Sequence, residues 1–277
     1  IGKFFKENDA TSAMNAIIDT TKALRLSERR LFGSESKCNC KLTQLQVLGL
    51  LMLFPCFMIR NAYNYGKSSL SSLFDCRKDV FYRFISNESY DWRKILATVS
   101  LQLWNKTQEN RSRESTEPVC LMVDDTDYPK RGIQTELIGK IYSHVTHSMM
   151  LGFKGLFIGI TDGFSQMLLD FALVGEEGKN GNYGLKQKQL DARFCKEHAE
   201  GSHTAKRIEE YNQSKIALMI EMIRRIIKRK IHFDYVLADS WFACAEVILF
   251  ITSRHVRCHY LGMIKMGKTK YIYKGKE

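Results

Sequence analysis

The sequence predicts an α/β (α+β) chain in which an all-helical N-terminal region precedes a mixed β-sheet with flanking helices. Three observations predict it. Residues 10–103 carry apolar side chains mainly at helical spacing. From residue 119 onward, short apolar runs alternate with glycine-rich turns and amphipathic stretches. Two of those runs, VCLMVDD at 119–125 and DYVLADSW at 234–241, are apolar at consecutive positions, which is typical of strands buried on both faces.

In the N-terminal region we expect helices at residues 10–26, 41–59, 68–74 and 78–85, and another that begins near 92 and runs through 103. The apolar run at 47–59 is too short to span a bilayer. It contains Pro55, so we expect a buried helix that bends or ends near that proline. The pair 68–74 and 78–85 could form a DNA-reading helix–turn–helix, with Arg77, Lys78 and Arg83 exposed. An ordinary helical bundle with solvated basic positions explains the same pattern.

A polar segment at residues 106–117 contains no apolar residue and is followed by Pro118. Such a stretch is typical of a linker. We therefore place a boundary there, between a helical region at 1–117 and a second region at 118–277.

In the second region we expect strands at 119–123, 143–161 and 166–174, with a hairpin turn at Asp162-Gly163 before the last of them. A glycine-rich loop at 175–184 and one long helix at 203–230 follow. A strand at 234–238, a helix at 242–253 and a strand at 259–263 complete the pattern. Three antiparallel strands followed by helix-linked parallel strands form a mixed sheet. In that arrangement the first strand is central, and the strand after the long helix pairs beside it.

Asp125 and Asp239 stand at the ends of these two neighbouring strands, although 114 residues separate them in the sequence. Paired carboxylates are suitable ligands for a hard divalent cation such as Mg²⁺. Asp124 points to the opposite face if Asp125 faces the metal, because side chains alternate along a strand; the reverse assignment of the two stays open. Taken singly, Asp125 is also explained by a turn in DDTDYP, and Asp239 by a cap on a helix from Trp241.

The formal net charge is +12, and it is spread along the chain. Residues 1–118 contain 18 Lys and Arg against 12 Asp and Glu, and residues 119–277 contain 24 against 18. Such a surface attracts polyanions, and together with a metal site it indicates phosphodiester chemistry. A basic protein without a nucleic-acid role is the alternative. The candidate DNA-phosphate contacts are Lys130, Arg131, Lys154, Lys186 and Lys188, with Arg77, Lys78 and Arg83 in the helical region.

Four motifs in this order carry a resemblance to a known family. They are VDDTDYPKRG at 123–132, HVTHSMMLGFKGLFIGITDG at 144–163, NYGLKQKQL at 182–190 and DYVLADSWF at 234–242. The layout resembles the ribonuclease H-like catalytic core of DDE transposases, and in particular bacterial insertion-sequence transposases with a β-rich insertion before the third carboxylate. The resemblance covers about residues 40–277. It implies that Asp125 and Asp239 are the first two catalytic carboxylates and bind Mg²⁺ or Mn²⁺, with two ions about 3.5–4 Å apart in the complete site.

The family's third carboxylate lies in a Y-x-x-R-x-x-x-E-x-x-x-x-x-x-K pattern, which this sequence does not contain after Asp239. Tyr271 with Lys274 and Tyr273 with Lys276 do not fit the spacing, and Glu277 is no substitute. We therefore expect a fragment that is truncated before the third carboxylate and is inactive by itself.

The resemblance implies a DNA transposase that cleaves double-stranded DNA at transposon ends and joins it to a target. It further implies a homodimer on DNA and a bacterial, cytoplasmic, nucleoid-associated protein without membrane attachment. Two alternatives stay open. One is a ribonuclease H-like nuclease that hydrolyses DNA without strand transfer, and the other is a non-catalytic DNA-binding remnant of a transposase.

Overall fold

The computed structural model describes residues 9–109, 117–253 and 256–264, and the chain divides into two compact units. The first unit contains residues 1–109 together with 201–204, and the second contains 110–200 and 205–277. The boundary predicted at 117/118 lies a few residues C-terminal of this division.

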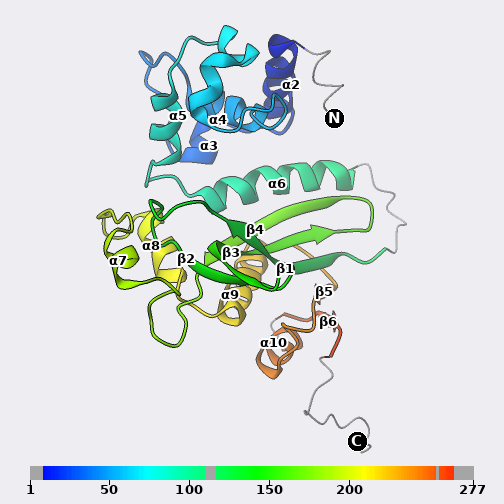
Figure 1. Cartoon of the computed structure of the whole chain (residues 1–277). Coiled ribbons are helices and arrows are strands. Elements are labelled where there is room, and N and C mark those ends of the chain that lie inside the picture. Colours follow the sequence, from blue (N-terminus) through cyan, green and yellow to red (C-terminus); the bar gives the residue numbers. More distant parts are fainter. Residues whose placement is uncertain (1–8, 110–116, 254–255, 265–277) are drawn as a thin grey trace, which may run out of the picture. The chain divides into compact units, whose positions relative to one another are not determined.

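The first unit is helical (Figure 1), and it is built around an aromatic core. Phe54, Tyr65 and Phe81 pack ring against ring, as do Phe32 and Phe84. Its elements are α2 (Ala10–Ala23), α3 (Glu28–Phe32), α4 (Gln44–Leu53), α5 (Lys78–Ile85) and α6 (Trp92–Glu109), with the 3₁₀ turns η1 (Ala62–Lys67) and η2 (Ser69–Ser72). As predicted, the apolar helix α4 ends just before Pro55.

The helix expected at 68–74 is only the 3₁₀ turn η2, so that prediction is wrong. The hydroxyl groups of Ser68, Ser71 and Ser72 each donate to the backbone carbonyl three residues earlier. Serine side chains that bond to nearby backbone in this way compete with regular α-helix. The two α-helices of a helix–turn–helix are therefore not formed here, and α5 packs against η1 and α4 in a helical bundle.

The second unit is a mixed six-stranded sheet covered by helices. Its strands follow the order β2-β3-β1-β5-β6, and β4 pairs with β3. β1 runs antiparallel to β3 and parallel to β5, which in turn is parallel to β6. The predicted topology, with the first strand central and the later strand beside it, is confirmed. The strands are β1 (Cys120–Pro129), β2 (Gly139–Ser143), β3 (Ser148–Thr161), β4 (Gln166–Val174), β5 (Tyr235–Ala238) and β6 (His259–Gly262).

Two details of the strands differ from the prediction. β1 does not end at Asp125 but continues in register with β3 to Pro129, whereas its parallel partner β5 ends at Ala238. Of the expected strand at 143–161, only 148–161 forms β3; residues 144–147 are the turn of a hairpin that joins β3 to β2. The turn at Asp162-Gly163 is confirmed: the Asp162 side chain accepts two backbone N–H groups of the turn, and Gly163 has a φ of +87°.

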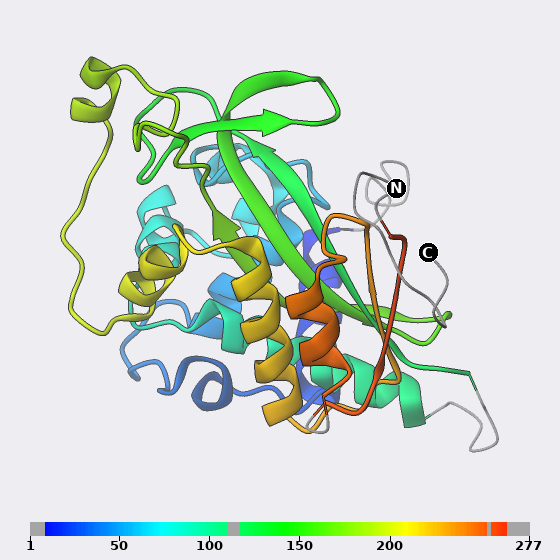
Figure 2. The ribbon, with the colours of Figure 1, turned by 90° about the horizontal axis from the view of Figure 1, so that it is seen from below.

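The helices of this unit are α7 (Gln187–Asp191), α9 (Lys215–Lys228), α10 (Ala245–Ile251) and, from residue 205 onward, α8 (His203–Glu210). α9 packs its apolar face on β3 and β4, and α10 lies beside it (Figure 2). A buried ion pair of 2.7 Å between Asp170 on β4 and Arg225 fixes α9 to the sheet. The first residue of α9, Lys215, contacts β1 by a separate ion pair with Asp125.

The single long helix expected at 203–230 is in fact two helices, α8 and α9, so that prediction is wrong. Ser214 caps the second helix, since its side chain accepts the backbone N–H of Ala217. Tyr211, in the break, is buried, and its hydroxyl donates to the Leu137 carbonyl. Tertiary anchoring of Tyr211 and the Ser214 cap together place the start of α9 at Lys215.

No helix in the described ranges is both long enough and apolar enough to cross a membrane.

Candidate active site

The parallel ladder between β1 and β5 brings the two predicted aspartates to one edge of the sheet. Its last pair is Val123 with Ala238, so the next residues on the two strands are Asp124 and Asp239, and Asp125 lies one step further. Asp239 has left the strand: its Oδ1 accepts the N–H of Trp241 at 2.9 Å. Because α10 begins only at Ala245, Asp239 closes a turn and does not cap a helix.

Asp125 is a strand residue, paired with Leu156 of β3, which removes the turn explanation considered for it. It shares its face of β1 with the buried residues Leu121 and Val123. Asp124 is exposed on the opposite face, where its Oδ1 accepts the N–H of Asp125. The two neighbouring carboxylates therefore have different surroundings, and only that of Asp125 faces the helix-covered side of the sheet.

Lys215, the first residue of α9, connects the two aspartate-bearing segments. Its Nζ lies 2.7 Å from Asp125 Oδ2 and 4.0 Å from the centre of the Trp241 ring. Both members of the ion pair are mostly buried, with side chains 21% and 23% exposed. Asp125, Lys215, Trp241 and the turn of Asp239 thus form one contiguous group. Neither Lys215 nor Trp241 is among the site residues predicted from the sequence. Trp241 could have been found from its position two residues after Asp239, whereas Ser214, as a possible N-cap, indicates at most a helix start and gives Lys215 no role.

A second ion pair lies two residues further along the same face of β1. Asp127 Oδ1 is 2.6 Å from Lys154 Nζ, and the Lys154 side chain is only 6% exposed. Burial by itself would raise the pKa of Asp127, but hydrogen bonds from Lys154 and Ser143 and the Lys154 charge outweigh it and lower that pKa. Because the Lys154 ammonium is buried and paired, the prediction that it contacts DNA phosphate does not hold.

Tyr260 on β6 lies behind the Asp239 turn. Its hydroxyl donates to the Asp239 backbone carbonyl at 3.4 Å. Burial, and then the negative charge of Asp239, raise the pKa of Tyr260. The tyrosine therefore stays a neutral donor at physiological pH and supports the backbone of the turn.

The donor chemistry of this edge fits a hard cation. Asp125 uses Oδ2 for Lys215 and Asp239 uses Oδ1 for Trp241, so each carboxylate retains a second oxygen. Carboxylate oxygens are the ligands that Mg²⁺ prefers. Within residues 9–109, 117–253 and 256–264, no group of three or more His, Cys, Asp or Glu side chains is arranged to hold a metal. The site as described therefore offers two carboxylates and no third.

The other basic residues predicted to contact DNA are exposed. Lys130 and Arg131 follow β1, and Lys186 and Lys188 lie at α7. Hydrogen bonds from Gln134 to the Ala192 carbonyl, and from Arg193 to the Ile138 carbonyl, join these two segments. In the other unit, the three predicted basic residues lie at or in α5 and are exposed: Arg77, Lys78 and Arg83.

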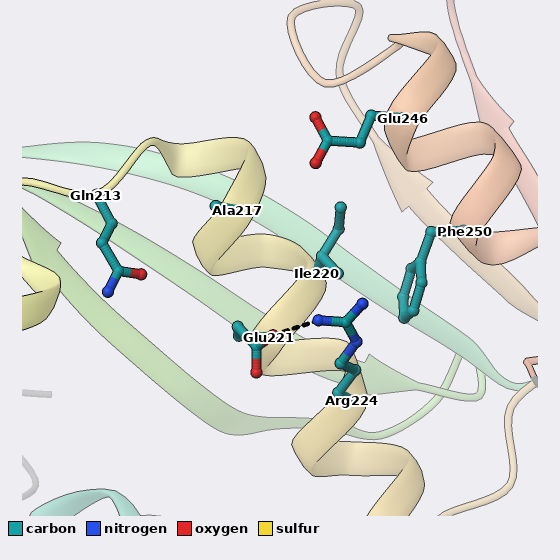
Figure 3. A pocket seen from close by; sticks show the side chains of 7 residues that line it. All are labelled: Gln213, Ala217, Ile220, Glu221, Arg224, Glu246 and Phe250. Carbon is teal, nitrogen blue, oxygen red and sulfur yellow. Dashed lines mark hydrogen bonds and ion pairs between the residues drawn. The ribbon is translucent and has the colours of Figure 1, made fainter.

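A separate cleft of about 490 Å³ lies between α9 and α10 (Figure 3). Arg224 pairs with Glu221 on α9 and lies 5.1 Å from the centre of the Phe250 ring, while Glu246 faces the cleft from α10. None of the described residues that line this cleft is a predicted site residue. The carboxylate edge, and not this cleft, is therefore the candidate active site.

Comparison with known proteins identifies the family. The sequence profile of the DDE superfamily endonucleases matches residues 70–270, most of the chain. The chain belongs to this family. Among solved structures, it is similar to the piggyBac transposase in its synaptic complex with hairpin DNA, with 11% sequence identity and a TM-score of 0.32. That similarity covers 94% of this chain and 43% of the transposase chain, so the chain spans less than half the length of that relative. None of the curated proteins compared with the chain matches it.

The matched range of this DDE endonuclease chain includes both Asp125 and Asp239. The family and the mixed sheet agree with the ribonuclease H-like fold expected from the sequence. The residues considered for a third carboxylate pattern, Tyr271, Tyr273, Lys274, Lys276 and Glu277, lie outside the described residues.

Proposed function

We propose that the whole protein is a DNA transposase that cleaves double-stranded DNA and joins the cut ends to a target. One observation supports this function above all. In a member of the DDE endonuclease family, Asp125 and the turn of Asp239 meet at one sheet edge through Lys215 and Trp241. We assign Asp125 and Asp239 as the carboxylates that act on the DNA.

Asp125 and Asp239 would hold Mg²⁺ or Mn²⁺ through their free carboxylate oxygens, with a second ion in the complete site. Such an ion would stabilise the negative charge that develops on the phosphate oxygens. The chain's own residues hold the two carboxylates in place: the β1–β3 ladder fixes Asp125, and the Trp241 N–H and Tyr260 fix the turn of Asp239. Asp124 is not assigned a catalytic role, because it faces the other side of β1.

Exposed basic residues would hold the DNA backbone, which requires positive charge but no fixed geometry. We assign this role to Lys130, Arg131, Lys186, Lys188, Arg77, Lys78 and Arg83, and no longer to Lys154. The two DNA ends that transposition must hold together would be bound by a homodimer.

The assignment of the carboxylates is tested in the whole protein by Asp125→Asn and Asp239→Asn, with Asp124→Asn as the matched control. We expect each of the first two variants to lose Mn²⁺ binding and to reduce DNA cleavage about a hundredfold or more, because a bound metal supplies several kcal/mol to this chemistry. DNA binding should survive in all three. Wild-type cleavage in Asp125→Asn or Asp239→Asn would contradict the assignment, and loss of cleavage in Asp124→Asn would reverse the Asp124 and Asp125 roles.

The same assay separates transposase from the two alternatives. Joined product from duplexes that carry the element ends supports strand transfer. Hydrolysis without joined product favours a nuclease of the same fold. DNA binding without any cleavage in Mg²⁺ favours a non-catalytic remnant.

A further inference from the structure

The positively charged Lys215 ammonium lies beside the Asp125 carboxylate and stabilises its negative charge. It is 2.7 Å from Asp125 Oδ2, and both side chains are mostly buried. A partly buried carboxylate without a counter-charge is costly, so this ion pair stabilises the folded protein. A metal ion bound to Asp125 would supply the same compensation with twice the charge. Either Lys215 or a bound metal ion can therefore neutralise the negative charge of Asp125.

Lys215 is also placed so that it can leave. It is the first residue of α9, next to the Ser214 cap, and its side chain is 21% exposed. Its ammonium is held on one side by Asp125 and on the other by the Trp241 ring, at 4.0 Å from the ring centre. Lysine is a flexible side chain with a compact charge, so it can turn to solvent without any movement of the helix. Lys154, which is 6% exposed in the middle of β3, has no such freedom.

We propose that Lys215 is an internal cation that competes with divalent metal for Asp125, so that metal binding releases Lys215 from the carboxylate and from the Trp241 ring. This inference rests on the proposed metal site at Asp125 and Asp239. It makes Lys215 a residue that sets metal affinity, and it makes Trp241 a reporter of the exchange.

The test is Mn²⁺ titration of the 277-residue chain, comparing wild type with Lys215→Met. Removal of a competing positive charge next to the ligand tightens Mn²⁺ binding by about tenfold or more. A lysine that merely held Asp125 in place would give the opposite result, because its loss would weaken Mn²⁺ binding. Lys228→Met is the matched control: it removes the same charge from an exposed position about 20 Å along α9, and should leave the affinity unchanged.

Trp241 fluorescence gives a second measurement that does not depend on cleavage. Mg²⁺ should change the Trp241 emission of the wild type, because it removes the ammonium from the ring. The change should be clearly smaller in Lys215→Met, which has no ammonium to move and retains only the effect of metal at Asp239, and absent in Trp241→Phe. An emission change as large in Lys215→Met as in the wild type would overturn the proposal.

Failure of the inference and failure of the metal site give different results. If wild-type Mn²⁺ binding is lost in Asp125→Asn but is unchanged or weaker in Lys215→Met, the site stands and the competition is refuted. If neither wild type nor Lys215→Met binds Mn²⁺, both proposals fail. Binding that appears only in Lys215→Met supports both. Thermal unfolding with and without Mn²⁺ serves as a check on folding, and a larger Mn²⁺-dependent rise in Tm for Lys215→Met than for wild type is expected.

Discussion

Asp125 and Asp127 lie two residues apart on the same face of β1, and a lysine from a different element neutralises each of them. The two ion pairs differ in what surrounds the lysine. Lys154 comes from the middle of β3 and is enclosed, whereas Lys215 comes from a helix terminus and reaches solvent. The enclosed pair can only be structural, while the terminal pair can be opened by a stronger cation. Of the two aspartate–lysine ion pairs on β1, one is therefore fixed and the other is exchangeable.

The Asp127–Lys154 pair should make the free energy of unfolding depend on pH in the acid range. The folded-state pKa of Asp127 lies below its ordinary value of 3.8, so the unfolded chain binds the proton first as pH falls. The contribution of the ionised Asp127 carboxylate to the free energy of unfolding is therefore complete above pH 3.8. It is lost as pH falls from that value through the folded-state pKa. We expect the urea midpoint to fall over this range in the wild type, and less steeply in Asp127→Asn.

Asp127→Asn should also lower the free energy of unfolding by about 3–5 kcal/mol at neutral pH, because the substitution leaves the Lys154 charge buried without its partner. Asp124→Asn is the control, because its exposed side chain should leave both the neutral-pH stability and the acid dependence nearly unchanged. An acid dependence in Asp127→Asn as steep as that of the wild type would contradict the role given to this pair.

At the scale of elements, the sequence predicted those features whose cause is local. The apolar runs identified the strands β1 and β5, Asp162-Gly163 identified a turn, and Pro55 marked the end of α4. Burial on both faces was not confirmed: β1 alternates partly buried and buried residues from Cys120 to Val123, and in β5 only Val236 is fully buried. The continuation of β1 past Asp125 and the break between α8 and α9 were not predictable in this way. They depend on the partner β3, and on the burial of Tyr211 against residues distant in the sequence.

In the candidate site too, the residues with a local sequence signal could be predicted, and those placed by tertiary structure could not. Asp125 and Asp239 could be predicted because each lies at the end of an apolar run, Asp239 directly after it and Asp125 one residue further on. Lys215 could not, because it looks like one of many lysines until the helix break places it at the N-terminus of α9. The burial of Lys154 likewise depends on strand register, which pairs it with Asp127.

The packing at the α8–α9 break gives a prediction about Gly175, which follows β4. A Cβ at this position would lie 2.1 to 2.5 Å from atoms of the buried Tyr211 ring. Gly175→Ala should therefore displace Tyr211 and cost about 1–3 kcal/mol of unfolding free energy, the usual cost of overpacking. Gly66→Ala, with no atom within 4 Å of the added Cβ, should be nearly neutral. Equal denaturation midpoints for Gly175→Ala and the wild type would show that Tyr211 is not held as described.

At the scale of the whole molecule, the excess positive charge is distributed over both halves of the sequence, so that both attract polyanions. Each half has six more basic than acidic residues. The seven basic residues proposed as phosphate contacts come from both units: Arg77, Lys78, Arg83, Lys130, Arg131, Lys186 and Lys188. DNA binding should therefore draw on charge from both units, without requiring sequence-specific contacts.

If all seven neutralise phosphates, the logarithm of the DNA association constant should fall with the logarithm of salt concentration with a slope of about −6. Lys186→Ala and Lys188→Ala should each weaken binding similarly on all DNA sequences and reduce the magnitude of the slope by about 1. Lys22→Ala is the control: Lys22 is exposed on α2, and Asp19 at 3.8 Å already balances its charge. Fluorescence anisotropy of a labelled duplex at increasing KCl measures these slopes. An unchanged slope in Lys186→Ala and Lys188→Ala would remove α7 from the DNA-binding surface, while leaving the assignment of Asp125 and Asp239 untouched.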